Sequence, residues 1–286
     1  MWFRKKEKIG MFIIHGFLGN STTGFGDLPE ILDKNKIKFY MPQLQGHGYN
    51  DDINTFDYKE CLNKVEVEYQ MFKKNFDKVY LMGFSMGGVI AGHLANLYGA
   101  DKLVLISPAY KYGGGSKITS KISDFFKAHK VKNEDEMADA LDKNLSKKDA
   151  EKLISDFMGE EPSDKIDLKG DYAGKLKKIK ISVFTNFMRL VSTVKKGLNP
   201  IDTPTRIYIS EHDDIVPVDS AFYIFDKISS TDKRITILTK VGHRVLMSEL
   251  REEIITEIIK FLYNKKKVRL WLRKKNLSRN LQIKNM

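Results

Sequence analysis

Short apolar runs alternate with longer stretches of mixed polarity in the first 110 residues of the chain. The run at 8–15 (KIGMFIIH) is long enough for a strand that is buried on both faces. Three further strand candidates are 37–42 (IKFYMP), 78–83 (KVYLMG) and 102–108 (KLVLISP). Between these runs we expect helices at 28–35, 57–75 and 86–98. This alternation predicts a parallel sheet covered on both faces, with the functional loops at the carboxyl ends of the strands.

The pattern changes after residue 115. The segment 116–197 is rich in lysine, aspartate and helix-forming residues, and it contains no convincing strand. We therefore predict a helical insertion, with helices at 116–130, 134–143, 147–158 and 172–196. Strand-like runs then return at 204–210 (PTRIYIS) and 234–240 (RITILTK), and 246–263 has the pattern of a final amphipathic helix.

The length and composition allow one large domain with an insertion. The chain has 286 residues, of which 42% are hydrophobic, enough for a sizeable core. We expect an α/β core at 1–110 and 200–264, a helical cap at 111–199 and a basic tail at 265–286. The single cysteine, Cys61, excludes a disulfide within the chain and is interpreted as a packing residue of a helix. Because no signal peptide and no long apolar run is evident, the sequence predicts a cytoplasmic protein that does not span a membrane.

The positive charge of the chain is concentrated at its end. Of the net charge of +12, the nine lysines and arginines after residue 263 account for nine units, so the remainder is nearly balanced. Val268, Trp271 and Leu272 would share one face of a helix surrounded by basic residues, which predicts contact with an anionic membrane surface. A solvated charged end is the alternative. No recognised nucleic-acid motif accompanies the charge, so we expect no nucleic-acid partner.

Residues 83–88 read GFSMGG and follow directly on an apolar run. Glycines on both sides of Ser85 remove the Cβ atoms that would crowd a sharp strand-to-helix turn, in which the serine has a strained backbone and an outward hydroxyl. The alternatives are an ordinary glycine-rich turn or a phosphate-binding loop. The stretch lacks the Lys-Ser/Thr ending of a P-loop, so it favours a nucleophilic serine.

A serine nucleophile needs a base and a group that orients the base. Among six histidines, His243 is favoured because it lies in a loop between the last strand candidate and the last helix. The acidic stretch SEHDDIVP lies before it in the chain and offers Glu211, Asp213 and Asp214, of which Asp213 is preferred. A solvated acidic loop remains the alternative reading of this stretch.

A serine that attacks a carbonyl group also needs two N–H donors for the carbonyl oxygen as it gains charge. The residue after the nucleophile, Met86, would provide one backbone N–H at the start of a helix. The other is expected from the N–H of Phe17 in HGFLGN, because Gly16 lets the backbone approach the substrate.

Several motifs in this order resemble one known family. HGFLGN, PQLQGHG, GFSMGG, DDIVP and VGH followed by LREEIITEIIKFL are similar to the α/β-hydrolase fold, and in particular to small bacterial carboxylesterases and monoacylglycerol lipases. The resemblance covers most of 8–263 and implies a triad of Ser85, Asp213 and His243, a structural role for His47 and a helical cap. The chain begins almost directly with the strand before HGFLGN. We therefore expect an abbreviated, mostly parallel sheet of about six strands.

The function expected from the resemblance is hydrolysis of short- to medium-chain acyl esters through an acyl-enzyme, without metal or cofactor. Thioester cleavage, acyl transfer, perhydrolysis and feruloyl ester cleavage would use the same triad. Dehalogenases and epoxide hydrolases of this fold have an aspartate where Ser85 stands. A non-catalytic binding protein is the alternative from another class. Residues of the cap that would line an acyl pocket, or simply pack the cap, are Phe125, Phe126, Phe157, Phe184, Phe187 and Met188.

Overall fold

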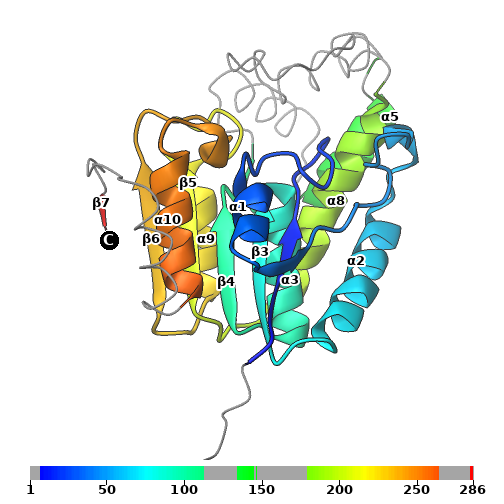
Figure 1. The fold of residues 1–286 in the computed structure, drawn as a ribbon. Coiled ribbons are helices and arrows are strands. Elements are labelled where there is room, and N and C mark those ends of the chain that lie inside the picture. Colours follow the sequence, from blue (N-terminus) through cyan, green and yellow to red (C-terminus); the bar gives the residue numbers. More distant parts are fainter. Residues whose placement is uncertain (1–6, 113–133, 145, 147–178, 264–283, 286) are drawn as a thin grey trace, which may run out of the picture.

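A seven-stranded sheet forms the centre of the molecule (Figure 1). The computed structural model describes residues 7–112, 134–144, 146, 179–263 and 284–285. The strand order is β2-β1-β3-β4-β5-β6-β7. The first six strands are parallel, as expected, and run from β1 (Ile9–Ile14) and β2 (Lys38–Tyr40) through β3 (Lys78–Phe84), β4 (Lys102–Ile106), β5 (Thr205–Ser210) and β6 (Lys233–Leu238).

The seventh strand comes from the basic tail. β7 (Lys284–Asn285) pairs antiparallel with Thr236 and Ile237 of β6. The sequence pattern does not predict it, because two polar residues have no apolar alternation. Pairing with the edge of β6 satisfies backbone groups that a free edge strand would leave open.

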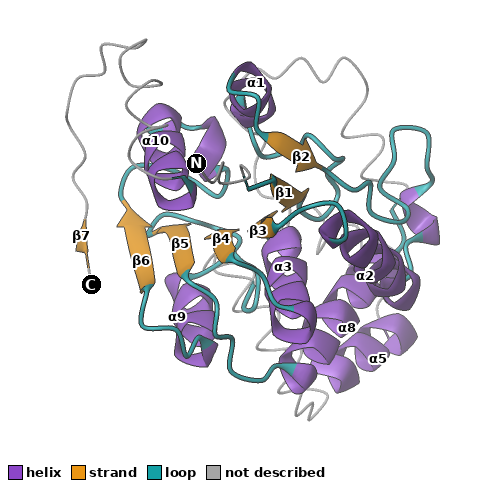
Figure 2. Cartoon of the chain, turned by 60° about the horizontal axis from the view of Figure 1, so that its bottom comes forward, coloured by secondary structure: helices purple, strands orange, loops and turns teal. Residues whose placement is uncertain are grey.

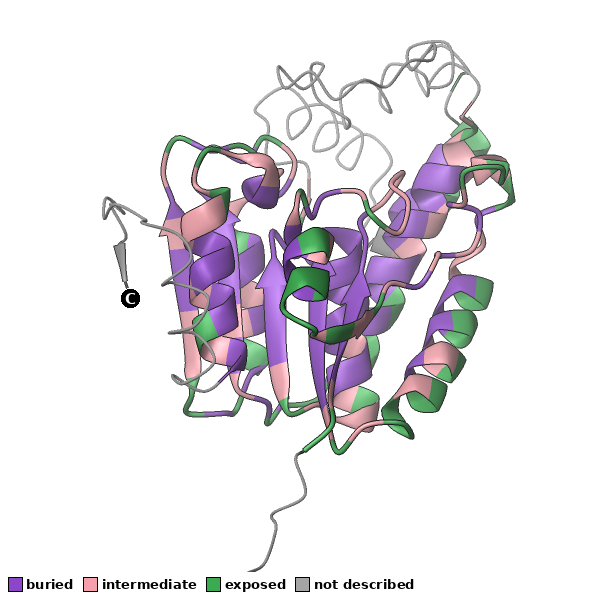
Figure 3. Cartoon of the chain, viewed as in Figure 1, coloured by how far each residue is buried: buried purple, intermediate pink, exposed green. Residues whose placement is uncertain are grey.

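Helices cover both faces of the sheet (Figure 2). One face packs against α1 (Leu28–Lys34) and α10 (Arg251–Leu262). The other packs against α2 (Tyr58–Lys73), α3 (Met86–Tyr98) and α9 (Val218–Lys227). α8 (Ile181–Gly197) packs on the outer side of α2 and α3, and α5 (Glu134–Asn144) lies along α8 (Figure 2). Alternate residues of a strand point to opposite faces of the sheet, so β1, β3 and β4, which are buried almost throughout, contribute apolar side chains to both faces. Figure 3 shows the consequence, a buried sheet between helices that expose only their outer surfaces.

Most of the predicted helices are present with small shifts at their ends. Of the helix expected at 172–196, α8 begins at Ile181, after Lys180, which has an extended backbone with ψ of 150°. Residues 172–178 lie outside the described residues. The helix expected at 246–263 is divided into a 3-10 turn at Val245–Met247 and α10. The helices expected at 116–130 and 147–158 lie outside the described residues.

Besides β7, two elements were missed by the hydrophobic pattern. α9 is one, since it directly follows the acidic loop and its first turn contains the polar residues Asp219 and Ser220, so no apolar period marks its start. It is nevertheless amphipathic, with Ala221 and Ile224 fully buried. The other is a short 3-10 turn at Ile53–Thr55, which is too brief for a periodic signal.

Among the described helices, none has both the length and the apolar character that crossing a bilayer requires. Cys61 lies buried in α2, where burial raises the pKa of its thiol to about 12. This agrees with the packing role expected for it.

Candidate active site

Ser85 lies in a sharp turn between β3 and α3. Its backbone has φ of 55° and ψ of −119°, a region that residues with a side chain rarely adopt. The strained turn expected from GFSMGG is therefore present. The Ser85 N–H donates to the Ile106 carbonyl at 2.9 Å, and the Ala109 N–H donates to the Ser85 carbonyl at 3.2 Å. The end of β4 thus holds the turn from both sides of the serine.

The glycines of this motif are required by close backbone contacts. A Cβ atom on Gly83 would lie 2.1 Å from the carbonyl oxygen of Gly87. A Cβ atom on Gly87 would lie 2.1 Å from the carbonyl oxygen of Ile14. Such distances are far inside van der Waals contact, so only glycine lets the first turn of α3 pack against the ends of β3 and β1.

Asp213 and His243 are joined by a hydrogen bond. The His243 Nδ1 donates to Asp213 Oδ2 at 2.7 Å, and the other carboxylate oxygen accepts from the N–H groups of Ile215 and Val216 at 2.9 and 2.8 Å. The Asp213 side chain is fully buried. A carboxylate satisfied in this way orients the imidazole with its Nε2 lone pair free for a proton.

The other acids of the same loop point to solvent. Asp214 is exposed, and Glu211 is exposed and lies 3.5 Å from the ring of His212. Neither shares a hydrogen bond with His243 among the described residues. The geometry therefore separates Asp213 from the alternatives that the sequence left open.

Ser85 and His243 are brought to the same edge of the sheet. The ring of Phe84, the residue before Ser85, lies 5.0 Å from the His243 ring between centroids. Within the described part of the chain, no hydrogen bond joins the Ser85 hydroxyl to the imidazole. Nucleophile and base are often loosely paired before substrate binds, so this arrangement is compatible with catalysis.

The loop after β1 is tied down by His15, which sequence reasoning did not single out. Its Nδ1 donates to the Gly16 carbonyl at 2.9 Å and its Nε2 accepts from the Leu44 N–H at 3.2 Å. Burial, and secondarily the neighbouring His47, lowers the pKa of His15 to about 3, so the ring is neutral. This tether fixes the backbone beside Phe17, one of the two expected oxyanion donors. The other, Met86, is fully buried at the first position of α3.

Comparison with known proteins places this architecture in a family. A family model described as Hydrolase_4, serine aminopeptidase S33, matches residues 5–250. The chain belongs to this family. Its sheet, its helices on both faces and its strand-to-helix serine turn are those of the α/β-hydrolase fold, which confirms the fold expected from the sequence.

Relatives of this S33 family member include enzymes that act on esters. The chain is 23% identical over 269 residues to a thermostable monoacylglycerol lipase of Bacillus sp. (strain H-257), covering 91% of this chain and 92% of the relative. It is 20% identical over 258 residues to a carboxylesterase of Bacillus subtilis (strain 168), covering 88% and 91%. A solved structure from a study of two metagenome-derived lipolytic enzymes, LipS and LipT, superposes with a TM-score of 0.61 at 16% identity, covering 90% of this chain and 94% of that one.

Three of the expected pocket residues of this S33 family member lie on α8. Phe184, Phe187 and Met188 are buried, and the Phe187 ring stacks on Phe17 with centroids 4.9 Å apart. Phe187 therefore adjoins the loop that would supply an oxyanion donor. All three also belong to the main hydrophobic core, so packing alone accounts for their burial. Phe125, Phe126 and Phe157 lie outside the described residues.

The other described histidines have different surroundings. His93 pairs with Glu66 at 2.8 Å between α3 and α2, and His212 is exposed. His47 is buried, which lowers its pKa to about 4, and its Nδ1 donates to the Gln45 carbonyl. This setting agrees with the structural role that the resemblance implied for His47. Among the described residues, no cluster of three or more His, Cys, Asp or Glu is arranged to hold a metal ion.

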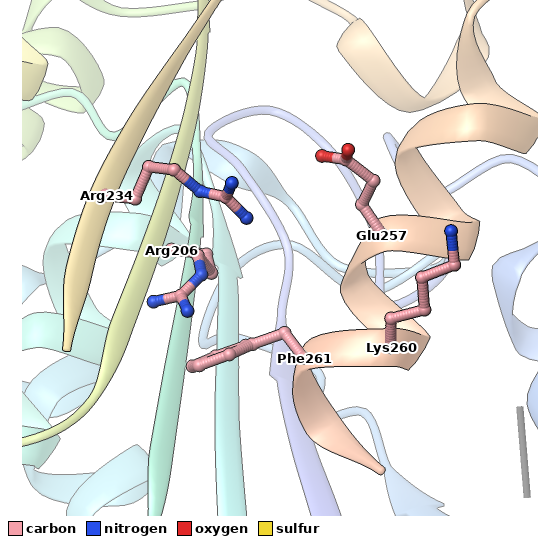
Figure 4. A pocket seen from close by; sticks show the side chains of 5 residues that line it. All are labelled: Arg206, Arg234, Glu257, Lys260 and Phe261. Carbon is pink, nitrogen blue, oxygen red and sulfur yellow. The ribbon is translucent and has the colours of Figure 1, made fainter. Parts of the chain in front are cut away.

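One hollow of about 220 Å³ lies away from these residues (Figure 4). It is lined by Arg206, Arg234, Glu257, Lys260 and Phe261. Arg206 and Arg234 stand near the amino ends of β5 and β6, whereas the candidate active site follows the carboxyl ends. Because its lining is mostly charged and it lies at the opposite ends of the strands, this hollow does not fit an apolar acyl group.

Proposed function

We propose that this chain is a serine hydrolase of carboxylic esters, with Ser85 as nucleophile, His243 as general base and acid, and Asp213 as the group that orients the imidazole. The observation that carries the proposal is the 2.7 Å bond between His243 and a fully buried Asp213, at the sheet edge where Ser85 occupies a strained turn. Membership of the S33 family and ester-cleaving relatives support the same reaction.

The acylation step follows from the hydrogen bond between His243 and Asp213. With Nδ1–H bonded to Asp213, the Nε2 lone pair takes the proton of the Ser85 hydroxyl as Oγ bonds to the acyl carbon. The carbonyl oxygen becomes an oxyanion, held by the backbone N–H groups of Met86 and Phe17. The Nε2–H then protonates the alcohol oxygen while its bond to the acyl carbon breaks.

Deacylation uses the same groups in reverse order. His243 removes a proton from water, the hydroxide oxygen bonds to the acyl carbon, and Ser85 leaves with the proton returned by the imidazole. The products are a carboxylic acid and an alcohol. No step needs a group beyond the chain and water.

The substrates we propose are short- to medium-chain acyl esters, including monoacylglycerols. The relatives named monoacylglycerol lipase and carboxylesterase support this class. In this proposal the cap expected at 111–199 covers the acyl group. Phe184, Phe187 and Met188 of α8 line the acyl pocket, and Phe187 stacks on Phe17. Thioester, acyl-transfer and feruloyl chemistry remain variants on the same triad.

We also propose a cytoplasmic enzyme whose basic tail at 265–286 contacts anionic membrane. The tail has nine basic and no acidic residues, which supports attraction to anionic lipid. Vesicles with and without phosphatidylserine test this part. The full chain should bind the anionic vesicles more tightly than a chain ending at Tyr263, and equal binding would refute the membrane role while leaving the esterase proposal intact.

The decisive experiment replaces Ser85 by alanine. Ser85→Ala should lower kcat on p-nitrophenyl butyrate by about 10⁶ and abolish labelling by a fluorophosphonate probe. The matched control is Ser230→Ala, because Ser230 is also buried but lies before β6 at the opposite edge of the sheet. Unchanged turnover in Ser85→Ala would refute the mechanism, and an unlabelled native chain would favour a binding protein.

A chain-length series of p-nitrophenyl esters and monoacylglycerols defines the acyl preference. An aminoacyl p-nitroanilide belongs in the same series, because the family description names an aminopeptidase. Faster cleavage of the anilide than of every ester would replace the ester proposal with a peptidase.

A further inference from the structure

The loop that carries His243 is weakly packed by side chains at its tip. It spans 239–244, between β6 and the turn at Val245–Met247. Lys240 has φ of 63°, and a Cβ atom on Gly242 would meet nothing within 4 Å. Val241 between them packs in the core, and hydrogen bonds add to this packing in holding the loop where His243 reaches Asp213.

Ser210 supplies one tether. It is the last residue of β5, and only 1% of its surface is exposed. Its hydroxyl donates to the Val241 carbonyl and accepts from the His212 N–H at 3.0 Å. A single buried hydroxyl therefore connects the loop of His243 with the residue before Asp213, and both its donor and its acceptor capacity are used.

Ser107 supplies a second tether from β4. It is fully buried, and its hydroxyl donates to the carbonyl of His243 itself at 3.2 Å. Its own backbone is fixed, because the Ser107 N–H donates to the Tyr208 carbonyl at 2.8 Å. The preceding residue, Ile106, accepts the bond from the Ser85 N–H. Adjacent residues at the end of β4 thus hold both the nucleophile turn and the histidine.

We propose that Ser107 and Ser210 are positioning residues for the reaction, which fix the backbone of 239–244 so that His243 lies correctly between Asp213 and Ser85. The inference rests on the proposed function and extends it to two residues that touch neither substrate nor reacting atoms. Proton transfer depends steeply on geometry, and a displacement of about 1 Å can lower a rate by about 10². Loss of the Ser210 hydroxyl also removes the hydrogen bond to the Val241 carbonyl, which favours movement of the loop. When the Ser107 hydroxyl is lost, by contrast, the His243 carbonyl keeps its bond from the Val245 N–H at 3.0 Å.

Thr205 offers a matched control at the other end of the same strand. It is fully buried, and its hydroxyl donates to the Thr203 carbonyl at 2.6 Å. Thr205→Val removes a buried hydroxyl bond from β5 without touching either loop. Ser210→Ala removes the equivalent bond at the carboxyl end. A purely structural role would give both variants the same consequences.

The measurement is kcat and KM on p-nitrophenyl butyrate, with thermal unfolding of each variant beside it. Ser210→Ala should lower kcat by about 10- to 100-fold with KM within about twofold, whereas Thr205→Val should keep kcat within about twofold even if both unfold at a lower temperature. Equal kcat values for Ser210→Ala and the native chain, or equal losses in the two variants, would overturn the inference.

A second variant covers the case in which Ser210→Ala does not fold. Ser107→Gly removes the other hydroxyl while suiting the φ of 42° at this position, which glycine adopts without strain. It should lower kcat by about 10-fold at unchanged KM. Native kcat in Ser107→Gly would overturn the inference for that residue.

A spectroscopic readout separates this inference from the esterase proposal. The proton between His243 Nδ1 and Asp213 gives a low-field proton resonance, which should shift or broaden in Ser210→Ala and Ser107→Gly but not in Thr205→Val. If the native chain cleaves no ester, the proposed function fails and this resonance still tests the positioning role. If the native chain is active and the resonance is unchanged in both serine variants, only the positioning role fails.

Discussion

The two ends of β5 and β6 differ sharply in the way they hold polar groups. At the carboxyl ends, Ser210, Asp213 and His243 are buried or nearly so and are bonded to segments distant in the chain. At the amino ends, Arg206 pairs with Asp232 at 2.7 Å, and its guanidinium lies 4.1 Å from the centre of the Phe261 ring. Arg206 also lines the hollow of Figure 4, whose other lining residues are mostly charged.

The difference agrees with the proposal that the reaction takes place at the carboxyl ends of the strands. Buried polar groups that bond across long chain separations fix geometry but depend on every partner being present. Charges near the surface are screened and contribute modestly. We therefore expect changes at the carboxyl ends to alter rate steeply, and changes at the amino ends to alter stability slightly.

The largest difference in kcat between the two ends is expected when Asp213 and Asp232 are each replaced by asparagine. Asp213→Asn should lower kcat by about 10⁴, because the amide neither fixes the imidazole tautomer nor stabilises the imidazolium that forms when His243 takes the proton. Asp232→Asn, at the amino end, should leave kcat within about twofold. Turnover of p-nitrophenyl butyrate measures both. A comparable loss in Asp232→Asn would remove the distinction between the two ends.

The next effect concerns crowding at the carboxyl edge. Gly87→Ala should destabilise the fold by more than about 3 kcal/mol, since the new methyl group would meet backbone carbonyls, although alanine is the better helix former by about 1 kcal/mol. Gly197→Ala at the end of α8 should change stability by less than about 1 kcal/mol, because nothing lies within 4 Å of its Cβ position. Urea unfolding compares the two, and equal losses would contradict the steric argument.

The buried histidines make stability depend on pH. The pKa values of His15 and His47 are lowered to about 3 and about 4, chiefly by burial, while in the unfolded chain each is about 6.5. Below about pH 6.5 the unfolded chain therefore binds protons that the folded chain does not, and stability falls as the pH drops toward 4. Each unit of pKa difference corresponds to about 1.4 kcal/mol, so the loss should reach a few kcal/mol.

Asparagine at position 47 tests this directly. His47→Asn retains a donor for the Gln45 carbonyl and should flatten the dependence of unfolding free energy on pH between about 4 and 6.5. His212→Asn is the control, because the His212 side chain is 65% exposed. Identical slopes in the native chain and His47→Asn would show that the imidazole is not held neutral by burial.

The smallest effect is expected at the amino ends. Arg206→Gln should lower stability by about 1 kcal/mol through loss of the Asp232 pair and the contact with Phe261, with kcat unchanged. Arg234→Gln should change stability by less than about 0.5 kcal/mol, since Arg234 makes no ion pair among the described residues. Thermal unfolding measures both. A tenfold loss of kcat in either variant would show that this end also serves the reaction.

The strands and the serine turn were the features that local sequence patterns predicted best. The central strands β1, β3 and β4 are buried and apolar on both faces, and the turn at Ser85 needs glycine two positions away in the chain, at Gly83 and Gly87. Both are properties of short stretches, so they are readable without the fold. α9 was missed because its first turn, which contains Asp219 and Ser220, continues the mixed polarity of the acidic loop, and periodicity cannot mark that boundary.

The supporting bonds of the site could not be predicted in the same way. Ser210 and Val241 are 31 residues apart, and Ser107 and His243 are 136 residues apart. A serine at the end of a strand carries no signal of which distant carbonyl its hydroxyl will meet. The same holds for His15, whose two nitrogens bond to Gly16 and to Leu44 in a separate segment.

The sequence by itself determined the parallel α/β architecture, the strained serine turn and the order of the motifs, because apolar periodicity and glycine placement act over a few residues. Only the tertiary structure decided that Asp213 rather than Asp214 faces His243, and that two buried serines hold the loop of that histidine. Those relations depend on how parallel strands align their carboxyl ends, and that alignment is a property of the folded sheet rather than of any one segment.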